Sequence, residues 1–179
     1  MKQPETTQQW WDRVSNSEEQ MINWLKDQYH GEVTAMQRIY NSIENYNLTG
    51  LERKIIESIS IDEAMHSKWV KKLLIDRGIE AEILQKEERY WNETLPQVLE
   101  ENTFTYFCAV GHLAETMRLD RISLLSQDER FQDIAKVFQD IYPDELFHAR
   151  VFKEMSAPED IKRAEKFHNI GMNAIGLIA

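Results

Sequence analysis

The sequence predicts an all-α protein, built as two helical hairpins that a long crossover joins and that one extra helix follows. Only 6 glycines and 4 prolines interrupt the 179 residues, and clusters of β-branched residues with alternating polarity are absent. Apolar residues instead recur at helical spacing in the longest segments. A chain of this length suits a single domain, residues 1–179, that buries its own core.

The first hairpin is expected to join a helix over residues 17–45 to a helix over residues 49–78. Apolar residues at helical spacing, among them Met21 and Leu25, mark the buried stripe of the first helix. Thr49 can cap the second helix with its hydroxyl, and Glu52 at the third position completes the pattern of a capping box. Gly78 is of the residue type that commonly ends a helix.

The second hairpin is expected to join a helix over residues 97–125 to one that runs from after Ser126 to about residue 155. Ser126 and Glu129 repeat the capping-box spacing. Residues 79–95, between the hairpins, are numerous enough to run back along the bundle as a crossover. After Ser156, a proline at a favourable first-turn position predicts a fifth helix to about residue 173.

One motif, Asp-Glu-x-x-His, occurs once in each expected hairpin, as IDEAMH and as PDELFH. Glu63 follows Glu32 by 31 residues, and Glu145 follows Glu115 by 30 residues. Positions i and i+3 share a helix face, so each motif presents an oxygen and a nitrogen ligand to the same side. The repeat therefore predicts a metal site to which both hairpins contribute. The expected ligands are Glu32, Glu63, His66, Glu115, Glu145 and His148.

Residues equally distant from the turn of a hairpin lie at the same height along it. In the first hairpin, the midpoint in sequence between Glu32 and the pair Glu63 and His66 falls near residue 48, within the expected turn. The midpoint of the second falls near residue 131, a few residues beyond the turn expected at residues 126–128. Either that turn is misplaced, or the ligand heights differ by about one helical turn.

Four buried carboxylates require compensating positive charge, because an unpaired buried charge costs on the order of several kcal/mol. Two divalent ions would balance the four glutamates, with His66 and His148 each completing one ion as a neutral imidazole. This ligand set suits iron or manganese. It contains no cysteine sulfur, so it does not fit a tetrahedral zinc site with thiolate ligands. We expect two iron ions, with manganese as the alternative. Asp62 and Asp144, directly before the motif glutamates, are placed to orient a histidine ring across the bundle.

Composition excludes several classes of partner. With 31 acidic and 21 basic residues the net charge is −10, and no basic segment alternates with aromatic residues, so we expect no nucleic acid. No apolar run reaches membrane-spanning length, and the first twenty residues resemble neither a signal nor a transit peptide. The single cysteine excludes an internal disulfide and fits a reducing environment. We expect a soluble, cytoplasmic protein.

With these motifs, the chain resembles the ferritin-like di-iron carboxylate superfamily, whose bundle carries one Glu on each of two helices and Glu-x-x-His on each of the other two. The stretch SISIDEAMHSKWVKKLLIDRG is similar to the second helix of bacterioferritins, and the second spacing is similar to that of rubrerythrins. The resemblance implies a ferritin-like four-helix bundle. Ala64 stands where bacterioferritins carry their haem-ligating methionine, so no haem is expected. No rubredoxin module is evident, which implies an external electron donor.

The resemblance also implies reaction with O2 or peroxide, and it leaves the activity open. The leading expectation is an oxidoreductase or oxygenase that activates O2 to oxidise a small organic substrate. The alternatives are peroxide reduction of the rubrerythrin kind and ferritin-type ferroxidase activity with iron storage. Storage requires a cage, whereas a homodimer cannot hold a mineral core. A structural helical module would bind no metal.

Several residues near the expected ligands are candidates for further roles. Gly111 either opens space beside the metals or permits close helix packing, and residues 106–108 either line an apolar pocket or belong to the core. His112 and Tyr29 each lie three residues before an expected ligand and are the candidate catalytic residues. His112 either approaches an iron or is a hydrogen-bonded core histidine, and Tyr29 offers a redox-active or hydrogen-bonding phenol. Pro143 removes a helix hydrogen bond near Glu145 and can kink the helix there.

Overall fold

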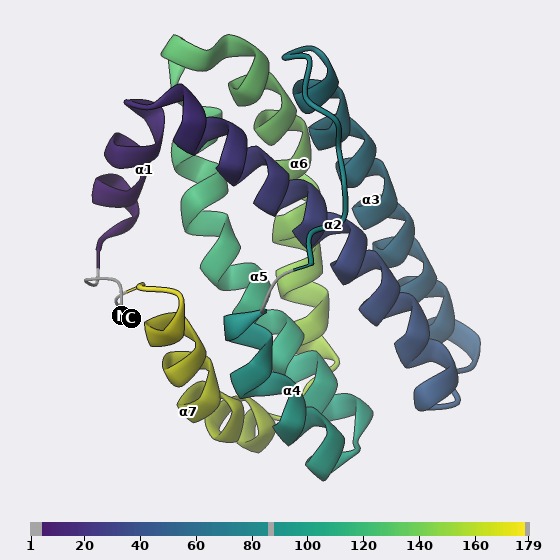
Figure 1. The fold of residues 1–179 in the computed structure, drawn as a ribbon. Helices are drawn as coiled ribbons and strands as arrows, with labels where there is room; N and C mark the ends of the chain where they lie inside the picture. The colour runs from purple at the N-terminus through teal and green to yellow at the C-terminus, as the bar shows by residue number, and fades with distance from the viewer. Residues whose placement is uncertain (1–4, 86–87, 178–179) are drawn as a thin grey trace.

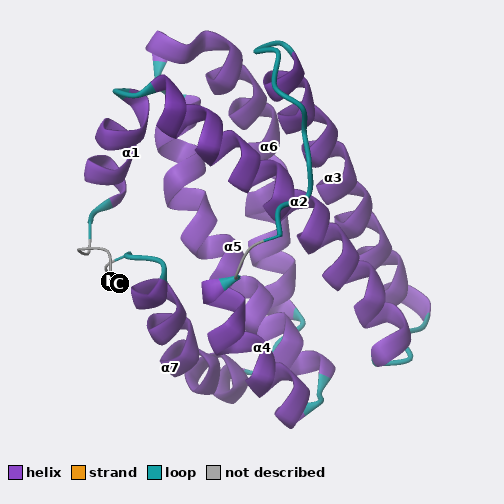
Figure 2. Ribbon diagram, viewed as in Figure 1, coloured by secondary structure: helices purple, strands orange, loops and turns teal. Residues whose placement is uncertain are grey.

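The computed structural model of the chain describes residues 5–85 and 88–177, and these parts form seven α-helices and one short 3₁₀ helix (Figure 1). Figure 2 shows helices joined by loops, with no strand in the described parts. None of the helices there combines the length and the apolar character needed to cross a membrane. In chain order the elements are α1 (Thr7–Ser15), α2 (Glu18–Asn45), α3 (Gly50–Ile75), α4 (Arg89–Glu101), α5 (Phe104–Ser126), η1 (Glu129–Phe131), α6 (Gln132–Glu154) and α7 (Pro158–Ala174).

Four long helices form the central bundle. The first hairpin pairs α2 with α3, the second pairs α5 with α6, and the two hairpins meet along α3 and α6 (Figure 1). The shorter α4 and α7 pack on one another and on α5, and α1 packs against α2 and α5. The predicted all-α, ferritin-like four-helix bundle is confirmed.

The first hairpin begins and ends close to its predicted limits. Ser17 caps α2, since its hydroxyl accepts a hydrogen bond from the Gln20 N–H at 3.3 Å. Thr49 occupies the N-cap position of α3, but its side chain makes no capping hydrogen bond, so the predicted capping box is wrong there. The helix ends at Ile75, a few residues before the predicted limit. Gly78 follows in a turn with φ of 69°, a conformation that glycine adopts without strain.

The predicted single helix over residues 97–125 is wrong, because the chain breaks it in two. Asn102 adopts a left-handed conformation, with φ of 47°, at the end of α4. Asparagine tolerates this region better than most residues. Thr103 then caps α5 by accepting a hydrogen bond from the Tyr106 N–H at 3.3 Å. Because α4 already begins at Arg89, the extended crossover is shorter than predicted.

The turn of the second hairpin is also displaced from its predicted position. The Ser126 hydroxyl donates to the carbonyl of Ser123 at 2.9 Å, so the predicted capping box with Glu129 is wrong. Asp128 is the capping residue instead, and its carboxylate accepts from the Arg130 N–H at 3.0 Å. The short η1 extends the turn to Phe131 before α6 begins. The predicted midpoint near residue 131 falls at the end of this turn, which extends further along the chain than predicted.

The first and last described residues, Glu5 and Leu177, lie side by side (Figure 1), and a helix adjoins each of them. The predicted fifth helix is α7, with Pro158 in its first turn. The sequence analysis missed α1, although Thr6 and Gln9 form a reciprocal capping box at its start, with hydrogen bonds of 3.2 and 3.0 Å. An isolated bridge between Glu5 and Leu177 links the segments that flank these helices.

The apolar core is divided along the bundle. A first cluster, containing Trp24, Val70, Ile122 and Ile141, fills one end. A second cluster, which contains Ile39, Ile59, Cys108 and Phe152, fills the other end. On every bundle helix the predicted metal ligands lie between the residues of the two clusters. The fold therefore places a polar layer between two apolar ones, and a third cluster joins α4, α5 and α7.

Candidate metal centre

Each bundle helix contributes one glutamate to the polar layer, and α3 and α6 each add a histidine one turn further along. The structure buries all of these side chains and brings them together from both hairpins. None is more than 5% exposed, and they are the six predicted ligands Glu32, Glu63, His66, Glu115, Glu145 and His148.

Four of the six form the tightest group. Glu32, Glu63, His66 and Glu145 offer ligand atoms that all lie within 4.8 Å of one another. The His66 Nδ1 atom is 3.6 Å from Glu145 Oε1 and 3.9 Å from Glu32 Oε2. Because His66 belongs to the first hairpin and Glu145 to the second, this group spans the junction of the two hairpins.

The other two predicted ligands lie beside this group and do not belong to it. His148 Nδ1 is 3.2 Å from Glu63 Oε1 and 4.0 Å from Glu145 Oε2. Glu115 completes the layer from α5 and is 5% exposed. Glu63 and Glu145 are therefore central, since both lie near His148 and Glu145 also lies near His66.

A carboxylate from the opposite hairpin orients each histidine ring. His66 Nε2 donates to Asp144 Oδ2 at 3.2 Å, and His148 Nε2 donates to Asp62 Oδ2 at 3.2 Å. The predicted cross-bundle role of the two aspartates is confirmed. Because these bonds engage Nε2, the Nδ1 atom of each ring faces the glutamates and is available to a metal ion.

The inner atoms of the layer fit a bound metal ion. Buried polar atoms normally find hydrogen-bond partners, so a convergent group that lacks them indicates a missing positive species. Carboxylate oxygens with few imidazoles are the ligands that iron and manganese prefer. Among the described residues, the buried atoms of the layer without a hydrogen-bond partner are Glu32 Oε2, both oxygens of Glu63 and of Glu145, Glu115 Oε2, and Nδ1 of His66 and of His148.

Sequence reasoning missed Arg118, whose guanidinium enters the layer from α5. Its Nη2 atom is 2.6 Å from Glu32 Oε1 and 3.0 Å from Glu145 Oε1. Its Nη1 atom is 3.6 Å from Glu115 Oε2. The signal in the sequence was an arginine three residues after an expected ligand, hence on the same helix face. Part of the positive charge in the layer therefore comes from the protein itself.

The glutamates on α2 and α5 hold their protons more tightly than usual. Burial raises the pKa of Glu32 well above its ordinary value, and the attraction of Arg118 offsets this only in part. Burial likewise raises the pKa of Glu115, and the nearby charge of Glu145 adds to the effect. Before a metal binds, these two carboxyl groups are the ones that favour the neutral form.

The motif glutamates behave in the opposite way. Burial acts to raise the pKa of Glu145, but Arg118 and His66 outweigh it and hold the pKa well below the ordinary value. Burial and Glu145 also act to raise the pKa of Glu63, and contacts with His148 and Arg118 reverse the direction. Burial opposes the charge on His66, yet the surrounding carboxylates raise its pKa to about 9. The centre of the layer is therefore a network of charged groups.

The two candidate catalytic residues lie outside this network of contacts. Tyr29 is half-buried and packs against the first cluster, and the structure gives its hydroxyl no hydrogen bond to the described residues. His112 Nδ1 donates to the carbonyl of Ala149 at 2.9 Å, as expected for a hydrogen-bonded core histidine. Burial lowers the pKa of His112, so the ring is neutral at neutral pH. Catalytic roles for both residues stay predictions.

The space expected around Gly111 is small. An ideal Cβ at Gly111 would lie 3.1 Å from the Phe152 ring, so the glycine permits close packing of α5 on α6. A cavity of about 30 Å³ lies beside it and is lined by apolar side chains, including Phe107. That volume corresponds to roughly one water molecule. Tyr106 and Cys108 are buried in the core and do not line this cavity.

Comparison with known proteins gives one match. The family model described as Rubrerythrin matches residues 23–156. This stretch contains most of α2 and all of α3 to α6, and therefore every predicted ligand. No curated protein and no solved structure matches the chain.

Proposed function

The chain belongs to the rubrerythrin family of the ferritin-like di-iron superfamily, and we propose that it is a di-iron oxidoreductase that activates O2 to oxidise or oxygenate a small organic substrate. One observation carries the proposal. Glutamate and histidine atoms from both hairpins converge in a buried layer and lack hydrogen-bond partners among the described residues. A layer built only for stability would leave few buried polar atoms without a hydrogen-bond partner.

In this proposal the six ligands would hold two ions. Glu32 and His66 would hold the first ion, and Glu115 and His148 the second. Glu63 and Glu145, which lie between the two histidines, would be shared. When bound, iron supplies the redox chemistry with O2 or peroxide, and manganese is the alternative metal. An external donor would supply electrons, and the single buried cysteine is compatible with a reducing cytoplasm.

Three residues of the chain have supporting roles. Asp62 and Asp144 keep the Nδ1 atom of each histidine directed into the layer. Arg118 pairs with Glu32 and Glu145, and a bound ion would take over this neutralising role at the two carboxylates. Its side chain as a whole is 22% exposed.

Metal analysis tests the ligand set. Anaerobic loading with ferrous iron should give two iron ions per chain by elemental analysis, and the loaded protein should change its absorption on exposure to O2. Glu63→Gln should lose most of the iron and the absorption change. Glu52→Gln is the matched control, since Glu52 is exposed on the same helix. Iron content that is the same in parent and Glu63→Gln would show that the ligand assignment is wrong.

Peroxide reduction is the second candidate, and the cavity beside Gly111 favours it. A space of about 30 Å³ suits O2 or peroxide and not an organic molecule. The family match points in the same direction. Peroxide consumption that depends on an added reductant and puts no oxygen into a product would select this candidate over an oxygenase.

A further inference from the structure

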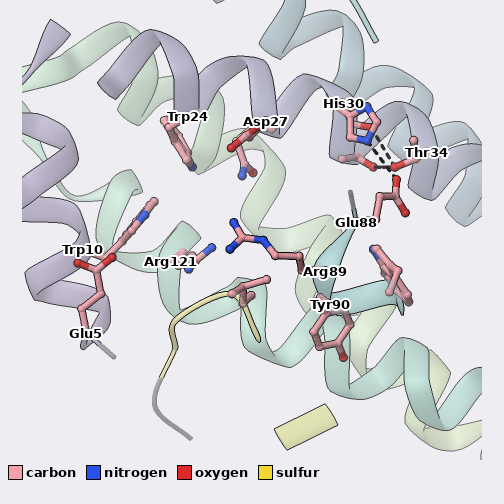
Figure 3. Close-up of a pocket in the computed structure, with 14 residues that line it drawn as sticks. Glu5, Trp10, Trp24, Asp27, His30, Thr34, Glu88, Arg89, Tyr90 and Arg121 are labelled. Carbon is pink, nitrogen blue, oxygen red and sulfur yellow. Dashed lines mark hydrogen bonds and ion pairs between the residues drawn. The ribbon is translucent and has the colours of Figure 1, made fainter. Parts of the chain in front are cut away.

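A larger pocket lies near the polar layer, between α1, α2, the start of α4 and α5 (Figure 3). Its volume is about 520 Å³, within the range of sites for small organic ligands. Residues from near both ends of the chain line it, including Trp10 and Ile175. On α2 its wall includes Gly31 and Thr34, on either side of the expected ligand Glu32 in the sequence.

Two arginines converge in this pocket. Figure 3 shows Arg89 and Arg121 pointing toward one another across it. The Nε atom of Arg121 is buried and makes no hydrogen bond to the described residues. Burial lowers the pKa of Arg121 to about 10, so the group is still charged at neutral pH. A largely buried cation with an unused donor, beside a second cation, is costly unless an anion lies between them.

The carboxylates in the pocket wall are already engaged. Glu88 pairs with His30 and with Arg38, both at 3.0 Å. Glu5 accepts a hydrogen bond from Arg13 Nε at 3.1 Å and adds a longer-range attraction to Arg121. Asp27, the remaining acidic residue of the wall, also has an interaction partner. None of the described carboxylates of the wall therefore hydrogen-bonds the Arg121 Nε atom.

Aromatic rings form part of the remaining pocket surface. The Arg121 guanidinium lies over the Trp10 ring, 4.6 Å from its centroid. Trp24 is only 6% exposed and lines the pocket, and its Nε1 makes no hydrogen bond to the described residues. Buried indole N–H groups usually have an acceptor. Tyr90, at the start of α4, also belongs to the pocket wall.

We propose that this pocket binds a small organic carboxylate with a planar, apolar body. The carboxylate would lie between Arg89 and Arg121, because a guanidinium binds a carboxylate through two parallel hydrogen bonds. The body would pack against Trp10 and Trp24. Naming this ligand as the substrate rests on the proposed function, whereas the binding site itself does not.

Benzoate is the probe for this site. Titration of the full-length protein, as purified and again after chelation of metal, should give saturable binding at one site per chain by calorimetry. Tryptophan fluorescence should change with the same affinity, because three indoles line the pocket. Benzyl alcohol, which keeps the ring and lacks the charge, should bind at least about tenfold more weakly.

Arginine variants locate the binding. Arg121→Gln and Arg89→Gln should each weaken benzoate binding at least about tenfold. Arg150→Gln is the matched control: it removes the same charge from an arginine on α6 whose side chain is 66% exposed, and affinity should not change. Arg89 is exposed, so its variant keeps the test valid if Arg121→Gln does not fold.

Four results would overturn the inference: no saturable benzoate binding, unchanged affinity in the folded arginine variants, benzyl alcohol binding as tightly as benzoate, or phosphate binding as tightly as benzoate. The last would indicate an inorganic anion. The binding site and the di-iron function can be contradicted independently. Benzoate binding to a protein that takes up no iron would contradict the proposed function and support the binding site. Iron uptake without benzoate binding would contradict the binding site and support the proposed function.

Discussion

At the scale of single residues, Asp62 and Asp144 show how the chain fixes its metal ligands. Each lies directly before a motif glutamate and accepts a hydrogen bond from the histidine of the other hairpin. The sequence contained this information because both aspartates accompany the repeated motif. Arg118 was harder to find, since many arginines lie three residues from a glutamate. Only the meeting of four helices makes one of them part of a buried charge network.

Asp144→Ala tests the orienting role of the aspartate. The change removes the acceptor of the His66 Nε2–H, so we expect iron affinity to fall by about tenfold to a hundredfold. The fold should persist, since the Asp144 side chain is 40% exposed. Affinity can be measured by competition with a chelator. Asp140→Ala, one turn earlier on α6 at an exposed ion pair with Lys136, is the control and should bind iron as the parent does.

Arg118→Gln tests the internal cation. The substitution leaves the carboxylates of the layer without their guanidinium partner, and removing one member of a buried ion pair costs about 3 kcal/mol. We therefore expect the free energy of unfolding of the metal-free protein to fall by about that amount. The loss should be smaller when metal is bound, because the ion replaces the missing charge. Urea unfolding with and without manganese measures both values, and an equal loss in the two forms would contradict this role for Arg118.

At the scale of elements, α7 docks on α4 through a glycine. An ideal Cβ at Gly171 would lie 2.7 Å from the edge of the Tyr90 ring and 3.2 Å from the Tyr90 carbonyl oxygen. The Tyr90 hydroxyl is held by His168 at 2.8 Å, which limits how far the ring can move. Gly171→Ala should therefore destabilise the protein by about 1 to 3 kcal/mol, as expected for overpacking.

Gly31→Ala is the control for Gly171→Ala. Gly31 also lies within a helix, but an ideal Cβ there meets no atom within 4 Å. Alanine is favoured over glycine in a helix interior by about 1 kcal/mol, so this variant should be slightly stabilised. Thermal unfolding of the two variants gives the comparison. Destabilisation of both to the same degree would show that packing against Tyr90 is not the cause.

The element boundaries show where sequence reasoning reached its limit. Long periodic helices such as α2 were predictable, because the capping residue and the apolar spacing indicate the same helix. The break at Asn102 was not predictable from the sequence, since the segment around it contains apolar residues on both sides and no glycine. The pocket with Arg89 and Arg121 lay beyond prediction for another reason. Its residues come from segments between Glu5 and Ile175, and only their packing in the fold brings them together.

At the scale of the whole molecule, the polar layer connects two hairpins whose bundle helices otherwise meet along α3 and α6. Metal bound by residues from all four bundle helices would add a link between the hairpins. A ligand that binds only the folded state raises the free energy of unfolding. We therefore expect manganese, added without oxygen, to raise the unfolding temperature of the parent. It should have little effect on Glu63→Gln.

The pH dependence of this effect follows from the protonation of the layer. The pKa of His66 is raised from 6.5 to about 9 in the folded, metal-free protein. A raised pKa means that folding favours the proton, so this stabilisation is fully present below pH 6.5 and is lost as the pH rises through 9. The raised pKa values of Glu32 and Glu115 act in the same direction, beginning from a lower pH. Over this interval the metal-free protein should become less stable as the pH rises.

Metal reverses this trend, because protons compete with the ion for the same atoms. A metal-bound imidazole must be deprotonated at its ligand nitrogen, so proton competition weakens as the pH rises from 6.5 toward 9. The increase in unfolding temperature on adding manganese should therefore be larger at pH 9 than at pH 6.5, and His66→Gln should reduce that difference. Calorimetric scans at the two pH values, with and without the ion, measure it. An increase of the same size at both values would mean that the ion binds away from the histidines, on ligands whose protonation does not change over this range.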